Sequence, residues 1–270
     1  MKKIIAAAVA TAFVAPAFAA EVTVSGAYDM VFVNGADSNR NAQSSEFKVG
    51  ASNEMDNGLS VSAYIEQQAS SHLNYVEISG GFGSIAMGTD GDSAISAYED
   101  KTDIAKFTGG DSGMSSLGNA PILFQPNLGI PGLTVGIGYD ADGTEELVDY
   151  GIQYSAMGVT ISYAAGDYEG TDSNPSVISA SFSSGPVYIA VDSVKNEGGV
   201  EGEDSDGLAA SYSFGAAKLY AEDHEHGSAN NETTVIGVSY SLGGGVSVYA
   251  EDEDQTAGEN GTYIGVEYNF

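Results

Sequence analysis

The sequence has no cysteine, no tryptophan and only eight lysine and arginine residues among 270. Without cysteine, an exported chain cannot be a disulfide scaffold, so its stability must come from a continuous hydrogen-bond network or a large core. The scarcity of basic residues leaves 38 Asp and Glu residues largely uncompensated, and the formal net charge is −30. This charge excludes nucleic acid as a partner, because the phosphate backbone would be repelled. It also disfavours docking on an anionic membrane surface, and it attracts cations.

Long apolar runs are missing as well. Beyond Ala20, no stretch approaches the roughly 18–20 apolar residues that a membrane-spanning helix needs. If the protein lies in a membrane, it must therefore cross it as a closed β-barrel, the other arrangement that leaves no backbone polar group unpaired in lipid.

The first residues have the features of a signal peptide. Two lysines precede an apolar stretch at residues 4–13, and Ala17-Phe18-Ala19 provides the small-x-small pattern of a cleavage site. An N-terminal membrane anchor is disfavoured, because the apolar stretch is too short to span about 30 Å of hydrocarbon as a helix. We expect residues 1–19 to be a cleaved signal peptide and residues 20–270 to form the barrel domain.

What the sequence does have is alternation with a period of two, interrupted about every ten residues by turn-forming residues. One set of alternating residues is apolar or aromatic, as in Ile264, Val266, Tyr268 and Phe270. The other set is small or polar, as in Tyr263, Gly265, Glu267 and Asn269, and segments 133–139, 187–192 and 208–214 repeat the pattern. An apolar face with aromatic residues near the strand ends, opposite a polar face suited to a wet interior, is typical of outer-membrane barrels.

Tight connections alternate with longer polar ones. The tight ones are at 56–58, 80–83, 157–158, 184–186 and 242–245, and the long ones are at 34–42, 167–174, 195–205, 225–231 and 252–260. Short turns at one end and longer loops at the other are the asymmetry of outer-membrane barrels. The segments number about sixteen, a size at which a barrel leaves an aqueous channel. The predicted fold is all-β, a transmembrane antiparallel barrel.

Two further features stand out. A hairpin-level repeat includes Tyr220-Ala221-Glu222-Asp223 and Tyr249-Ala250-Glu251-Asp252. One connection, from residue 89 to about residue 120, has no regular alternation, contains Lys101 and Lys106, and is rich in acidic residues. Connections of this length inside a compact domain are usually functional or disordered.

These features together resemble the sixteen-stranded, general Gram-negative porins. The resemblance covers nearly the whole chain after the signal peptide. It rests on the short-turn and long-loop alternation and on three motifs: the start Ala20-Glu21-Val22-Thr23-Val24-Ser25-Gly26, the stretch Gly81-Phe82-Gly83-Ser84-Ile85-Ala86-Met87-Gly88 before the long loop, and the terminal Tyr268-Asn269-Phe270.

The resemblance implies that the 89–120 loop folds into the barrel and narrows it. It also implies a homotrimer in outer-membrane lipid, with the first and last strands pairing to close each barrel. The family usually places an arginine cluster opposite the acidic loop, whereas this chain has one arginine, Arg40. A weak basic wall facing an acidic loop favours cations. The residues expected to line the constriction are Asp90, Asp92, Glu99, Asp100 and Asp103 from the loop, with Lys48 and Glu66 on the wall.

No cofactor is expected to be required, and no catalytic residue is identified. Ser70 and Ser71 adjoin His72, but neighbours on a strand point to opposite faces. His224, His226 and Glu222 share one face if their strand continues, although a solvated rim is favoured over a metal site. Calcium is a candidate ligand of the acidic loops, because these offer hard oxygen ligands; its candidate ligands are Asp90, Asp92, Glu251 and Glu253.

The function predicted from the sequence is a cation-preferring outer-membrane pore for passive diffusion of small hydrophilic solutes and ions, not an enzyme. A substrate-specific channel is the main alternative. It is kept open by tyrosines on the predicted lumen side, which are Tyr188, Tyr220, Tyr249 and Tyr263. A barrel enzyme or a plugged structural barrel is a further alternative, and a plugged barrel would show no unit conductance.

Overall fold

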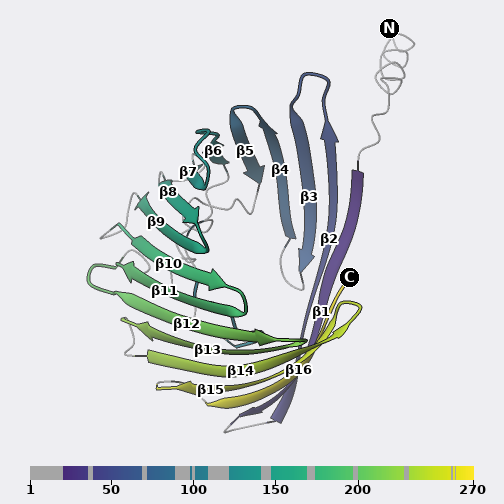
Figure 1. Ribbon diagram of the computed structural model, residues 1–270, viewed down its shortest axis with the longest axis vertical. Coiled ribbons are helices and arrows are strands. Elements are labelled where there is room, and N and C mark those ends of the chain that lie inside the picture. Colours follow the sequence, from purple (N-terminus) through teal and green to yellow (C-terminus); the bar gives the residue numbers. More distant parts are fainter. Residues whose placement is uncertain are drawn as a thin grey trace.

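The structure, a computed structural model, describes residues 21–35, 39–68, 72–88, 98, 101–108, 122–140, 147–168, 174–196, 200–227, 231–256, 258 and 260–270. These residues form sixteen antiparallel strands that close into one barrel (Figure 1). The strands are β1 (Glu21–Gly35), β2 (Asn39–Glu54), β3 (Ser60–Gln68), β4 (His72–Gly80), β5 (Gly83–Gly88), β6 (Ile122–Pro126), β7 (Leu133–Asp140), β8 (Leu147–Ala156), β9 (Val159–Tyr168), β10 (Ser176–Ser184), β11 (Val187–Lys195), β12 (Ser205–Phe214), β13 (Ala217–His226), β14 (Asn231–Gly243), β15 (Val246–Gln255) and β16 (Gly261–Asn269). Within the described ranges, no helix is long and apolar enough to cross a membrane.

Each strand pairs with its neighbours in the sequence, and β1 pairs with β16 to close the barrel. The closing register places Met30 opposite Val266. Beyond the last ladder pair, Gly26 and Phe270 exchange two backbone hydrogen bonds of 3.0 Å each. The predicted all-β barrel and its closure between the first and last strands are therefore confirmed.

The period-two pattern sorts side chains between the two faces of the barrel wall. On β11, Ile189 and Val191 are 45% and 46% exposed on the outer face, whereas Ala190 and Asp192 are 1% and 3% exposed on the inner face. Because successive side chains of a strand point to opposite faces, this single register decides which residues meet lipid and which meet the interior.

The tight connections lie at the end of the barrel where β1 begins and β16 ends. The β8–β9 connection is a two-residue turn in which Met157 and Gly158 have φ of 53° and 83°. Positive φ at both positions matches the right-handed twist of a hairpin. A Cβ on residue 158 would also overlap the carbonyl oxygen of Ser183, so glycine is required there on both counts.

Several predicted long connections are shorter than expected. Strand β1 continues to Gly35 and β2 begins at Asn39, so most of 34–42 is strand. Strand β13 continues to His226 and β15 to Gln255, so much of the polar sequence assigned to loops at 225–231 and 252–260 is paired backbone. The ladder can continue beyond the lipid, where water tolerates polar side chains, and polarity alone does not mark a strand's end. The connection between β5 and β6, predicted at 89–120, spans residues 89–121.

Candidate functional site

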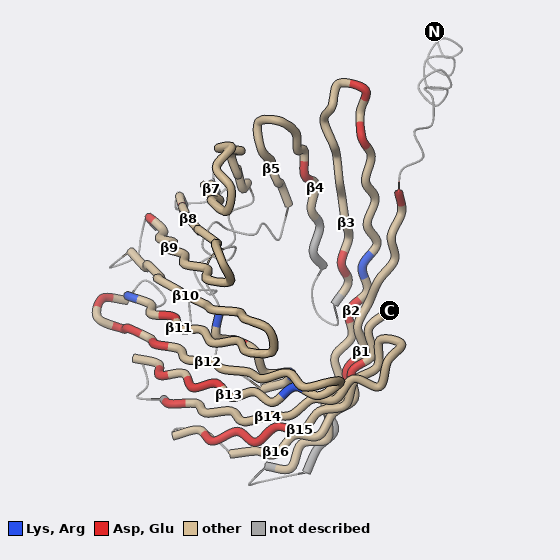
Figure 2. Tube along the Cα trace, viewed as in Figure 1, with Lys and Arg blue, Asp and Glu red and all other residues tan. Residues whose placement is uncertain are grey.

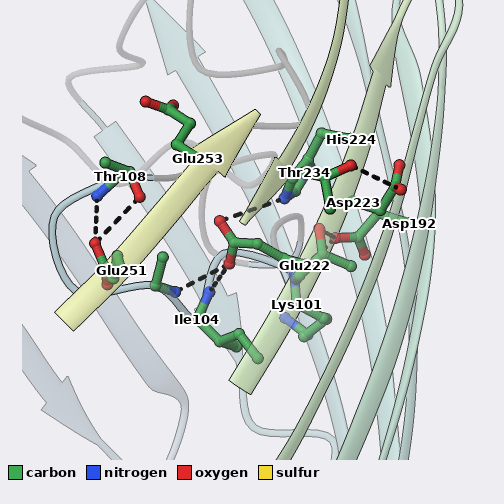
Figure 3. Close-up of polar contacts among 12 residues, drawn as sticks. Lys101, Ile104, Thr108, Asp192, Glu222, Asp223, His224, Thr234, Glu251 and Glu253 are labelled. Atoms are coloured by element: carbon green, nitrogen blue, oxygen red, sulfur yellow. Dashed lines mark hydrogen bonds and ion pairs between the residues drawn. The ribbon is translucent and has the colours of Figure 1, made fainter. Parts of the chain in front are cut away.

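Part of the long β5–β6 connection lies inside the barrel against its inner wall (Figure 3). The carbonyl of Tyr98 accepts a hydrogen bond of 3.2 Å from the Ser179 hydroxyl on β10, and its own hydroxyl accepts one of 3.1 Å from the Gln125 amide on β6. Residues 101–108, called the inward segment below, then pass β11, β13 and β15 in that order. A carboxylate on each of these three strands binds the backbone of the segment.

The first of these carboxylates is Asp192 on β11. Its Oδ2 accepts hydrogen bonds from the backbone N–H of Lys101 (2.9 Å) and from the N–H and hydroxyl of Thr102 (3.1 and 2.7 Å). The Tyr188 hydroxyl donates to the Lys101 carbonyl at 2.6 Å. A Cβ at Gly207, opposite Asp192 on β12, would lie 2.6 Å from the Thr102 hydroxyl, so the segment approaches the wall where the wall has no side chain.

The second carboxylate is Glu222 on β13. Its Oε2 accepts hydrogen bonds from the backbone N–H groups of Ile104 and Ala105, both at 2.9 Å. Glu222 is 2% exposed, and the ring of His224, which is fully buried, lies 3.8 Å from its other oxygen. Hydrogen bonds offset the lost hydration of a buried carboxylate, and here the inward segment supplies two of them, both to Oε2.

The third carboxylate is Glu251 on β15. It accepts hydrogen bonds from the backbone N–H groups of Lys106, Phe107 (3.1 Å) and Thr108 (3.0 Å), and from the Thr108 hydroxyl (3.1 Å). The Tyr220 hydroxyl on β13 donates to the same carboxylate at 2.6 Å. Glu251 thus joins two strands and the inward segment through one buried charge.

The far end of the inward segment is held by a side-chain ion pair and by packing. The Lys106 ammonium lies 2.7 Å from Glu267 on β16, which also accepts a hydrogen bond of 3.0 Å from the Ser247 hydroxyl. The Phe107 ring lies 5.4 Å from the Tyr263 ring, centroid to centroid, beside a buried cluster that includes Val31 and Val33. The segment is therefore attached along its whole described length.

Carboxylates outnumber ammonium groups on the inner face. Figure 2 shows acidic residues in β13 and β15, with few basic residues anywhere on the trace. The described inner-face carboxylates are Glu21, Asp29, Glu46, Glu54, Glu66, Glu77, Asp149, Asp192, Glu222, Glu251, Glu253 and Glu267. The described basic residues near them are Lys48, Lys101, Lys106 and Lys218.

Some of the residues predicted to line the constriction lie within the described ranges. Asp103 is exposed on the inward segment, between the residues bound by Asp192 and those bound by Glu222. Lys48 and Glu66 face each other on β2 and β3 and form an ion pair of 2.8 Å. Asp90, Asp92, Glu99 and Asp100 lie outside the described residues. Whether these residues set a constriction stays a prediction.

The candidate calcium ligands are dispersed. Glu251 and Glu253 lie within β15 rather than on a loop, and their carboxylates accept hydrogen bonds from Tyr220 and Tyr263, respectively. Asp90 and Asp92 are outside the described residues, and within the described part of the chain no three His, Asp or Glu side chains are grouped to hold a metal. Calcium binding stays a prediction.

His224 on β13 and three of the lumen tyrosines differ from what their sequence context suggested. His224 was expected on a solvated rim, but it is 0% exposed. Tyr220, Tyr249 and Tyr263 are at most 8% exposed, and their hydroxyls donate to carboxylates. These three tyrosines link neighbouring parts of the wall through their hydroxyls and do not offer ring faces to a solute.

The anchoring roles of Asp192, Glu222 and Glu251 were not predicted from the sequence. Alternation places the three on the inner face, but it does not reveal that a loop from another part of the chain binds them. The available signal was the repeat Tyr220-Ala221-Glu222-Asp223 and Tyr249-Ala250-Glu251-Asp252. It sets the same tyrosine and carboxylate pair on the inner face of β13 and of β15.

A closed sixteen-stranded barrel with a segment fixed inside it defines a porin-type membrane protein. The sequence matches the family model described as Gram-negative porin over residues 6–268, and the chain belongs to this family. No curated protein sequence matches the chain significantly.

Solved structures with the same fold include a triple mutant of the Rhodopseudomonas blastica porin, at 17% identity and a TM-score of 0.72. A loop-deletion mutant of OmpT, an outer membrane protein of Vibrio cholerae, has 17% identity and a TM-score of 0.74. Each match covers 93% of this chain and 100% of the other. At this identity the likeness concerns the fold. With the family, it makes the protein an outer-membrane pore, and the family and fold are those of channels.

Proposed function

We propose that this porin is a channel for passive diffusion of small hydrophilic solutes and ions, that it prefers cations, and that the inward segment narrows it. The observation that carries the proposal is the excess of inner-face carboxylates over ammonium groups beside that segment. In a narrow lumen bounded by a low-dielectric wall, carboxylates in excess of ammonium groups attract cations and raise the barrier to anions. The formal charge of −30 extends this field beyond the segment.

The test is the reversal potential of single channels in a planar bilayer under a KCl gradient. We expect discrete conductance steps and a reversal potential on the cation-selective side. Asp103→Asn removes an exposed carboxylate from the inward segment and should lower the preference for K⁺ over Cl⁻. Lys106→Met removes an ammonium group from the same segment and should raise the preference for K⁺ over Cl⁻.

Glu232→Gln is the matched control, because Glu232 is exposed near the start of β14, away from the inward segment. It should leave the reversal potential within error of the unaltered protein. Anion selectivity, or equal effects of the three substitutions, would contradict the proposal. A folded barrel that never shows unit steps would favour a plugged barrel or an enzyme instead.

We infer further that the pore is a homotrimer, as the resemblance to general porins implies. Tyr28 on β1 is 39% exposed on the outer face, and its hydroxyl donates to the Gln43 amide on β2 at 3.3 Å. This polar pair lies beside the apolar Met30 and Phe32, and polar groups facing lipid are costly, which supports a protein neighbour there. Light scattering in detergent should give three times the chain mass; a single chain mass would refute the trimer.

A further inference from the structure

Two tyrosines on the inner face of β3 and β4 remain accessible, unlike the buried tyrosines near the inward segment. Tyr64 and Tyr75 are directly opposite each other in the ladder, and their ring centroids lie 4.9 Å apart with planes inclined by 39°. Both side chains are half-buried. Their outward neighbours Ile65 and Val76 are 60% and 41% exposed on the lipid side, so the two rings border the lumen.

Carboxylates surround this aromatic pair. The Tyr75 hydroxyl donates to Glu77 at 2.8 Å, and this bond to an anion makes the phenol ring richer in electrons. Glu66, two residues from Tyr64 on the same strand, is 3% exposed. Among the described residues here, the Lys48 ammonium is shared between Glu66 and Glu46, both at 2.8 Å. The local charge near the rings is therefore negative.

An acidic cavity adjoins the pair on the side toward the tight turns. Ser62, directly opposite Glu77, lines it together with Ser79. The cavity has a volume of about 780 Å³, and the charged residues that line it are Glu21, Glu54 and Asp56. None of its described lining residues is Lys, Arg or His. The potential in the cavity is therefore negative, which favours a cation beside the aromatic pair.

We propose that Tyr64, Tyr75 and Glu77 form a binding subsite for organic ammonium solutes, such as quaternary amines, within the lumen. The face of a tyrosine ring attracts a cation within about 6 Å of its centroid, and two inclined rings can contact one ammonium group together. A quaternary ammonium group has no N–H to donate in a hydrogen bond. The negative charge of the Glu77 carboxylate therefore attracts it electrostatically. An anionic solute would be repelled by the same carboxylates. This subsite rests on the proposed channel function and adds a solute class to it.

The test uses choline as the probe and its uncharged isostere 3,3-dimethyl-1-butanol as the comparison. Choline added to one side of single channels in KCl should reduce the conductance in a saturable way, and the alcohol at equal concentration should not. The double substitution Tyr64→Leu and Tyr75→Leu keeps apolar volume but removes the ring faces. It should weaken choline block about tenfold, as the loss of two ring contacts implies.

The matched control is Tyr240→Leu, since Tyr240 is 50% exposed on the outer face. It should leave the block unchanged. The subsite would be overturned if choline blocked the double variant as strongly as the unaltered protein, or if the alcohol blocked as strongly as choline. Saturation-transfer NMR of choline on the folded barrel in detergent gives a second measurement that needs no conductance. Loss of the choline signal in the double variant supports the subsite, and an unchanged signal refutes it.

The failure of the subsite can be distinguished from failure of the channel proposal. A cation-selective reversal potential without choline block leaves the channel proposal intact and removes the subsite. Choline block without cation selectivity in KCl keeps the subsite and removes the general cation preference.

Discussion

At the scale of single residues, the inner wall relies on carboxylates that accept several donors at once. Glu251 is the clearest case, because three consecutive backbone N–H groups and a tyrosine hydroxyl converge on it. An amide at this position would keep the shape of the side chain, but it would retain one acceptor oxygen and turn an NH₂ group toward the remaining donors. The charge is thus needed for local structure as well as for the field in the lumen.

Glu251→Gln should therefore loosen the inward segment without unfolding the barrel. Leaving buried N–H groups unsatisfied costs about 1–3 kcal/mol, so local opening should become roughly 5- to 150-fold more frequent. Hydrogen–deuterium exchange of the backbone amides of Lys106, Phe107 and Thr108, followed by mass spectrometry, measures this change. Glu225→Gln on the exposed end of β13 is the matched control and should not accelerate exchange there. Unchanged exchange in Glu251→Gln would contradict the anchoring role.

At the scale of strands, the wall near the inward segment is built from tyrosines that lie over glycines of the next strand. Tyr220 on β13 pairs with Gly237 on β14, and a Cβ at residue 237 would overlap the tyrosine ring. Tyr249 on β15 pairs with Gly265 on β16 in the same way. A glycine in a strand lacks a packing side chain, and a cross-strand aromatic ring covers the exposed backbone. Lying across β14, the Tyr220 ring places its hydroxyl within hydrogen-bond distance of Glu251 on β15.

Gly237→Ala should consequently destabilise the barrel, although alanine is ordinarily the better residue in a strand. The added methyl group displaces the Tyr220 ring and breaks its hydrogen bond to Glu251, and we expect a loss of about 1–3 kcal/mol. The temperature at which the folded band disappears in heat-modifiability gels should fall. Gly81→Ala serves as the control, because a Cβ there would meet no atom within 4 Å. Equal transition temperatures for the two variants would argue against a required glycine at position 237.

At the scale of the whole molecule, the proposed cation selectivity rests on summed charge rather than on one pair of residues. The carboxylates of the inner face act together, and Figure 2 shows acidic residues gathered on β13 and β15. The ion pairs of Lys48 and Lys106 with wall carboxylates offset only part of this charge.

A summed field of this kind is screened by salt. The Debye length falls from about 10 Å at 0.1 M to about 3 Å at 1 M ionic strength. The ratio of K⁺ to Cl⁻ permeability should therefore decrease markedly when both chambers are raised to molar KCl at a fixed concentration ratio. Reversal potentials across a series of concentrations measure this dependence. A ratio that does not change with salt would mean that selectivity arises at a short-range binding site instead.

Much of the architecture was predictable from local pattern. Alternation such as Ile264, Val266 and Tyr268 against Tyr263, Gly265 and Glu267 assigns faces correctly, because the side-chain period of a strand is fixed at two. The strand number followed from the turn residues. Strand ends were less predictable: Glu251 and Glu253 were assigned to a loop but lie in β15, since the inner face of a barrel strand accepts polar side chains.

The sequence by itself determined the barrel, its inner and outer faces and the sign of its charge, because each of these depends on period, composition and nearest neighbours in the chain. Only the tertiary structure decided which inner-face residues act together. Asp192 binds Lys101 across a separation of 91 positions, and Glu251 binds Phe107 across 144. The closure of the barrel brings such residues into contact, and no local pattern encodes that distance. The same closure buried three tyrosines beside the inward segment and left Tyr64 and Tyr75 facing the lumen.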